Sequence, residues 1–139
     1  MNGYVHLDLT RTWALDEGFA PEVAEEIARA DIGVDSVFPG RQWRYKGYHF
    51  RWLGARRHAA RFLARAIEIA DPTLLGMALH FEQDALSHGH VGHLFHYPGI
   101  DIWNRRSPHV RSLIERRSRE MLRAYRDAVP DERREAQPD

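Results

Sequence analysis

The sequence predicts an all-α protein, a single compact domain of five helices. Its 139 residues provide one hydrophobic core but leave no room for a second sizeable one. Apolar residues recur at helical spacing over several long segments. Asp71-Pro72 and Ser107-Pro108 are typical helix starts, because each pairs a capping side chain with a proline at the first helical position. No segment shows a convincing strand pattern, so we expect the helices to pack as a bundle.

The first half of the chain predicts two helices followed by a loop. Apolar spacing favours a helix over 5–19, with Gly18 as its stop. A second helix starts around Pro21, because proline is tolerated in the first turn, and we expect it to end near Ile32-Gly33. Residues 35–48 are interrupted by proline and glycine, and we expect them to form a loop.

The second half predicts three longer helices. The third helix is expected over 50–70, the fourth over 72–89 and the fifth over 108–129. The remaining residues are polar, which predicts a disordered tail over 130–139. The helical domain is therefore expected to cover residues 1–129.

Composition excludes several classes of protein. Basic and acidic residues balance at 20 each, which argues against a polycation that holds nucleic acid by charge alone. The absence of cysteine excludes disulfide scaffolds and thiol chemistry. No apolar run approaches the roughly 20 residues of a membrane-spanning helix, and the first residues lack a signal-peptide pattern. We therefore expect a cytoplasmic protein without a transmembrane segment, and the sequence leaves its oligomeric state open.

The strongest chemical pattern lies in the fourth predicted helix, where His80, Asp84 and His88 follow one another at intervals of four residues. Four residues advance a helix by about 40° beyond a full turn, so an imidazole and a carboxylate at this spacing reach one cation. An ionised Asp84 in this apolar helix is costly unless it meets a cation or an arginine. We expect the domain to bind metal, with an ion pair between Asp84 and an arginine as the alternative.

Other predicted elements also carry ligand-type residues. Each alone suits a structural or exposed role, but together they suit a multi-metal cluster in a bundle core. These residues are His6, Asp35, His49, His90 and His109. Zinc suits such a set of imidazole and carboxylate ligands, and iron or manganese would also fit.

The order of these residues resembles that of the zinc-dependent phospholipase C and S1/P1 nuclease superfamily, whose members are all-helical trinuclear zinc phosphoesterases. The resemblance covers roughly 5–93, and its most specific part is the segment LLGMALHFEQDALSHGH. It implies two or three Zn²⁺ ions. One ion would take Asp35, His49, His80 and Asp84. A second would share Asp84 and take His6.

The implied third ion would take His90 together with a later histidine and a carboxylate one turn apart. His109 is the nearest such histidine, but Leu113 stands four residues on, which departs from the family pattern. A second resemblance, to helical segments of bacterial polymorphic-toxin tails, favours His88 over His90 as the ligand. The sequence leaves both open.

The family resemblance implies a hydrolase that cleaves a phosphoester with a metal-activated water. Zinc lowers the pKa of a bound water towards about 7. Asp35 and Asp84 are the expected catalytic carboxylates, and Arg51 and Arg105 are the expected substrate-binding arginines. The substrate would be a small-molecule or lipid phosphoester, either a phospholipid headgroup or a nucleotide, with nucleic acid also open. The alternatives are a non-haem iron oxygenase or lyase using the same cluster, and a protein with a purely structural metal.

Overall fold

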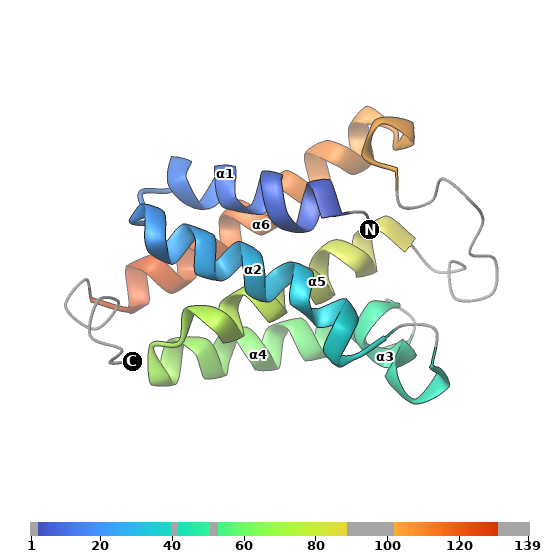
Figure 1. Cartoon of the computed structure of the whole chain (residues 1–139), viewed down its shortest axis with the longest axis horizontal. Helices are drawn as coiled ribbons and strands as arrows, with labels where there is room; N and C mark the ends of the chain where they lie inside the picture. Colours follow the sequence, from blue (N-terminus) through green and yellow to red (C-terminus); the bar gives the residue numbers. More distant parts are fainter. Residues whose placement is uncertain (1–2, 40–41, 51–52, 89–101, 131–139) are drawn as a thin grey trace.

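The computed structural model describes residues 3–39, 42–50, 53–88 and 102–130, and these residues form helices and no strand. Figure 1 shows the helices side by side in a bundle. The α-helices are α1 (Thr10–Asp16), α2 (Pro21–Val37), α3 (Lys46–His49), α4 (Ala55–Ile69), α5 (Pro72–His88) and α6 (Pro108–Ala128). A six-residue π-helical segment, η1 (Tyr4–Leu9), leads into α1, and η2 (Trp43–Tyr45) and η4 (Trp103–Arg105) are 3₁₀ turns between the later helices. The all-α prediction is confirmed.

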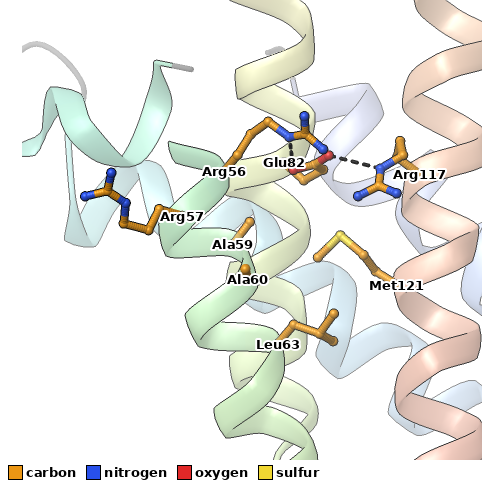
Figure 2. Close-up of a pocket in the computed structure, with 8 residues that line it drawn as sticks. All are labelled: Arg56, Arg57, Ala59, Ala60, Leu63, Glu82, Arg117 and Met121. Carbon is orange, nitrogen blue, oxygen red and sulfur yellow. Dashed lines mark hydrogen bonds and ion pairs between the residues drawn. The ribbon is translucent and has the colours of Figure 1, made fainter. Parts of the chain in front are cut away.

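Helix α5 is the centre of the bundle. It packs against α2, α4 and α6, and thirteen of its seventeen residues are buried. Most of its polar residues are therefore inside the protein as well. Glu82, for example, bridges Arg56 of α4 and Arg117 of α6 (Figure 2). A buried ionisable side chain needs such partners, because an isolated charge in the interior is very costly.

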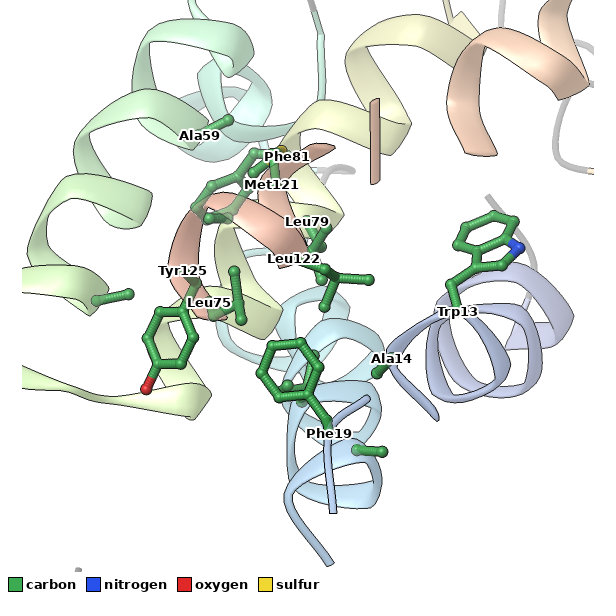
Figure 3. Packing of buried hydrophobic residues seen from close by; sticks show 14 of the residues in the cluster. Trp13, Ala14, Phe19, Ala59, Leu75, Leu79, Phe81, Met121, Leu122 and Tyr125 are labelled. Atoms are coloured by element: carbon green, nitrogen blue, oxygen red, sulfur yellow. The ribbon is translucent and has the colours of Figure 1, made fainter. Parts of the chain in front are cut away.

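The apolar core fills the space between α5, α6 and the first two helices. Leu75 and Leu79 of α5 belong to the same cluster as Leu122, Phe19 and Tyr125 (Figure 3). The rings of Phe19 and Tyr125 stack with their centroids 6.2 Å apart. Burial of each large side chain stabilises the fold by about 1.5–3 kcal/mol, so this cluster fixes α5 in position.

The predicted helix starts at the two proline pairs are confirmed. Asp71 Oδ1 accepts hydrogen bonds from the backbone N–H groups of Thr73 and Leu74, at 2.8 and 3.2 Å. Ser107 Oγ accepts one from the N–H of Val110 at 3.3 Å. These side chains satisfy backbone donors that the first turn of a helix leaves free. Gly18 follows the end of α1 with a φ of +87°, which confirms it as a helix stop.

The expected end of the second helix is wrong. Helix α2 continues past Gly33 to Val37, so Asp35 is a helical residue rather than the start of a loop. The glycine weakens the helix locally, but Val34 in the following turn is buried in the core and its packing outweighs that cost. Asp31 and Asp35 consequently lie one turn apart on the same face.

The expected count of five α-helices is also wrong, since the described residues contain six. The additional helix is α3, which has four residues and ends at His49, so it lies mostly within the segment 35–48 that we expected to form a loop. A single turn is too short to show a hydrophobic period. The long helix α4 begins only at Ala55, because Gly54 has a φ of +110° and turns the chain there.

A close approach between α2 and α5 brings the polar residues of the two helices together. Gly76 of α5 faces the α2 backbone so closely that a Cβ atom would clash with the carbonyl oxygen of Ile27. It would also lie 2.7 Å from Ala30 Cβ and 3.0 Å from the backbone nitrogen of Asp31. Only glycine fits there without displacing one helix from the other.

Residues 131–139 of the expected tail lie outside the described residues. Within the described part, no helix has the length and apolar character needed to cross a membrane.

Candidate metal centre

Imidazoles and carboxylates from four elements meet in the interior of the bundle. Segment η1 contributes His6, α3 contributes His49, and α2 and α5 each contribute two residues one turn apart. The set is His6, Asp31, Asp35, His49, His80 and Asp84. All are buried except Asp35, whose side chain is 51% exposed and forms the solvent side of the cluster.

Four of these residues, Asp35, His49, His80 and Asp84, form a first group that could hold a metal ion. His49 Nδ1 is 2.8 Å from Asp84 Oδ2, and His80 Nε2 is 3.3 Å from both atoms. Asp35 Oδ1 is 3.6 Å from His80 Nε2 and 3.8 Å from His49 Nδ1. Ligand atoms about 2.0–2.1 Å from a tetrahedral zinc ion lie about 3.3–3.4 Å from one another. The spacing therefore fits a four-coordinate ion.

The ring of His49 is oriented by the loop before it. Its Nε2–H donates to the backbone carbonyl of Phe38, which can only accept. In the neutral ring Nδ1 then carries the lone pair, and that lone pair faces a carboxylate oxygen of Asp84. Two acceptors at this distance repel each other unless a proton or a metal ion lies between them. Metal-binding histidines are typically held in this way by an acceptor on their second nitrogen.

His6, Asp31 and His80 form a second group that could hold a metal ion. Asp31 Oδ1 is 2.7 Å from His6 Nδ1 and 3.3 Å from His80 Nδ1. The other nitrogens of these two rings face Asp84, with His6 Nε2 at 3.4 Å from Oδ1 and His80 Nε2 at 3.3 Å from Oδ2. A neutral imidazole has only one N–H, so each ring directs at least one lone pair at a carboxylate.

Several atoms of this second group lack a proper hydrogen bond. Among the described residues, both nitrogens of His6, Nδ1 of His80 and Oδ1 of Asp31 are buried without a partner at hydrogen-bonding angles, although their contacts are short. Buried polar atoms are rarely left in this state. One cation beside Asp31 would satisfy His6 Nδ1, His80 Nδ1 and Asp31 Oδ1, whereas His6 Nε2 faces Asp84 on the other side of the ring.

A hydrogen-bonded chain behind the cluster holds Asp31 in place. Thr10 Oγ1 donates to Asp31 Oδ2 at 2.7 Å, and Gln83 Nε2 donates to Thr10 Oγ1 at 2.9 Å. The amide of Gln83 also contacts Ser118 Oγ at 3.3 Å. These hydrogen bonds connect α1, α2, α5 and α6 around one carboxylate. They also fix which oxygen of Asp31 faces the imidazoles.

The electrostatics of the cluster show the same need for positive charge. Burial alone would lower the pKa of His6, but the charge of Asp31 together with the contacts to Asp31 and Asp84 raises the pKa from 6.5 to about 9. Burial and His6 lower the pKa of His80, yet Asp84 and Asp31 raise it above its ordinary value. Despite burial, nearby positive charge holds the pKa of Asp31 below 3.8 and that of Asp84 well below it. In the metal-free protein, His6 and His80 therefore hold a proton more tightly than a free imidazole does.

The other predicted site residues lie elsewhere or outside the described residues. His88 is buried with Nδ1 3.3 Å from the carbonyl oxygen of His49, but it belongs to neither group. His109, at the start of α6, and Arg105, in η4, are exposed. His90 and Arg51 fall outside the described residues.

Sequence reasoning missed Asp31. The spacing that marks His80 and Asp84 also marks Asp31 and Asp35, and this second pair could have indicated the residue. It was hidden because the second helix was expected to end near Ile32-Gly33.

The comparisons add no relative from which function could be transferred. Family models, curated proteins and solved structures give no match to the chain. Inference about this centre therefore depends on its own geometry.

Proposed function

We propose that the chain is a metal-dependent phosphoester hydrolase, similar in fold type and ligand order to the phospholipase C and S1/P1 nuclease superfamily. The observation that carries this proposal is the convergence of three imidazoles on Asp84. Each of His6, His49 and His80 presents one nitrogen to this carboxylate within 3.4 Å.

Asp84 is suited to bridge two cations. Its Oδ2 faces His49 and His80, whereas its Oδ1 faces His6. A carboxylate that binds one ion through each oxygen is typical of two-metal hydrolases, whose ions lie about 3.5–4 Å apart and clamp the attacking and leaving oxygens. Ions of this kind supply Lewis acidity and an activated water at neutral pH.

The buried residues of the cluster would hold the ligand geometry, and the half-exposed residue would meet the substrate or water. His49 and His80 are fixed by Phe38 and Asp31, so the interior wall is preorganised. Asp35 is the only half-exposed member, and it stands where a substrate or a water approaches from solvent. Its carboxylate could exchange with an incoming oxygen ligand or accept a proton from it.

A purely structural metal is the second candidate, and one observation favours it. The first group already provides four protein ligands, and a complete tetrahedral set leaves no open position for substrate. The half-exposed position of Asp35 favours catalysis instead, because a solvent-facing ligand can be displaced more easily than a buried one.

A phosphodiesterase assay with bis-p-nitrophenyl phosphate, combined with metal analysis of the purified chain, separates these candidates. A hydrolase should contain zinc or manganese, turn over the substrate, lose activity with a chelator and regain it with the metal. A structural metal gives bound ion without turnover. Bound iron with a visible absorption band would instead support the oxygenase or lyase alternative, and absence of any bound ion would reject all three.

A further inference from the structure

A second polar site lies on another side of α5, away from the proposed metal centre. Glu82 follows His80 by two residues, which turns its side chain about 200° around the helix axis. There α4, α5 and α6 line a pocket of about 350 Å³ that is open to solvent, within the size range of small-molecule sites. Figure 2 shows Glu82 between two arginines at one end of the pocket, with Leu63 and Met121 further along it.

Glu82 holds both arginines through the same atom of each. Its Oε2 is 3.2 Å from Arg56 Nε, and its Oε1 is 3.2 Å from Arg117 Nε. A guanidinium has five N–H donors, so this contact occupies only one donor on each side chain. Arg117 Nη1 donates in addition to Glu120 at 2.6 Å. Among the described residues, the Nη groups of Arg56 and Nη2 of Arg117 have no protein partner.

The pocket offers hydrogen-bond donors that suit an anion. Arg56, Arg57 and Arg117 line it together with the single carboxylate of Glu82, but the guanidinium of Arg57 is directed away from Glu82 (Figure 2). Glu120 pairs with Arg117, so the remaining donors of Arg56 and Arg117, rather than an excess of charge, would hold an oxyanion. The Glu82 side chain is 4% exposed and links the arginines of two helices. Because it holds both guanidiniums in place beforehand, less side-chain freedom is lost when a ligand binds.

The rest of the pocket is apolar. Ala59, Ala60, Leu63 and Met121 line it, and the two small alanines leave room that larger side chains would fill. Arginine donors at one end and an apolar wall beside them suit a ligand with the same division. We propose that this pocket binds a small oxyanion that carries a short apolar chain. The binding site is independent of the metal centre and of the function proposed for it.

Binding is tested on the full protein, with and without Zn²⁺. Three probes separate the contribution of the oxyanion from that of the apolar chain. Hexanoate carries both parts, acetate carries only the oxyanion and 1-hexanol carries only the chain. None of them is a phosphoester, so turnover at the metal centre cannot contribute. Met121 lines the pocket and the chain has only three methionines, so its ¹³C-labelled methyl group is a resolved NMR reporter.

We expect hexanoate to shift the Met121 signal saturably and to bind at least about ten-fold more tightly than acetate or hexanol. Arg56→Gln should weaken hexanoate about ten-fold or more, because it removes charged hydrogen-bond donors. Arg61→Gln is the matched control, since it removes one positive charge from the same helix but lines a different pocket. Ala60→Leu should fill the apolar part and weaken hexanoate without weakening acetate. No saturable shift, equal binding of hexanol, or unchanged affinity in Arg56→Gln would each overturn the proposal.

Discussion

His80 and Asp84 lie one helical turn apart on α5, and His80 Nε2 is 3.3 Å from Asp84 Oδ2. The second nitrogen of the same ring faces Asp31 of α2 at 3.3 Å. One imidazole therefore joins a carboxylate of its own helix to a carboxylate of the neighbouring helix. The first group and the second group share this ring, and loss of it would affect both.

Removal of either residue of this pair should abolish metal binding. His80→Ala removes a ligand atom from both groups, and Asp84→Ala removes the carboxylate that three imidazoles face. We expect metal content and phosphodiesterase activity each to fall by orders of magnitude, as measured by elemental analysis and by substrate turnover.

His58→Gln is the matched control for these two variants. This histidine belongs to neither group and stacks on Tyr48, so its loss should leave the bound metal unchanged. Full metal content in a folded His80→Ala or Asp84→Ala protein would show that the residue concerned is not a ligand.

Asp31→Asn should weaken metal binding without eliminating it, if Asp31 orients His6 and His80 for the ion. The substitution keeps the size of the side chain but removes the negative charge that faces both rings. Loss of an outer carboxylate of this type typically lowers metal affinity about 10–100-fold. Competition with a chromophoric chelator measures this affinity, and ¹⁵N shifts of the metal-free imidazoles report which nitrogen carries the proton.

The control for this charge change is Asp8→Asn. Asp8 follows His6 by two residues in the sequence, but its side chain is 51% exposed. We expect the metal affinity and the imidazole ¹⁵N shifts of the Asp8→Asn protein to equal those of the wild type. Wild-type affinity in Asp31→Asn would contradict the orienting role.

The metal-free protein should lose stability as pH rises from 6.5 to about 9. In the folded state Asp31 raises the pKa of buried His6 from 6.5 to about 9. The folded state therefore binds this proton more tightly than the unfolded chain does, and the stabilisation is complete below pH 6.5. It is lost as pH rises through the folded pKa, and its size is on the order of 3 kcal/mol.

Urea unfolding of chelator-treated protein between pH 6 and 10 measures this dependence. The same titration of His6→Gln should be flatter, since the variant lacks the ionising ring. Equal slopes for the two proteins would contradict the assignment to His6. Zinc should remove the effect from the wild type, because a bound ion takes the place of the proton.

The sequence predicts the long helices and most of the cluster because both depend on local spacing. Proline and capping residues mark the starts of α5 and α6, and four-residue spacing places His80 beside Asp84. The metal groups also contain His6, Asp35 and His49, which were identified as ligand types from sequence alone.

What the sequence does not predict depends on contacts between distant segments. Gly33 suggests a helix end, but the core contact of Val34 extends α2 and places Asp35 one turn after Asp31 on the same face. The carbonyl of Phe38 selects the ring nitrogen of His49 that faces the cluster, and no motif encodes that contact. The pairing of Glu82 with arginines of α4 and α6 is likewise visible only after the helices have packed.

Gly76→Ala should damage both the fold and the metal centre, whereas Gly33→Ala should improve the fold. A Cβ at position 76 would meet the Ile27 carbonyl and lie 3.0 Å from the Asp31 nitrogen, so α2 and α5 would have to separate. Overpacking of this kind typically costs about 1–3 kcal/mol of folding stability.

Gly33→Ala is the matched control. At Gly33 no atom outside its own helix lies within 4 Å of an added Cβ, and replacing a helical glycine by alanine gains about 0.5–1 kcal/mol of folding stability. Urea unfolding and zinc titration of both variants measure these effects. Because separation of the helices would move Asp31 away from His80, we expect weaker zinc binding in Gly76→Ala alone, and equal behaviour of the two variants would contradict the close approach.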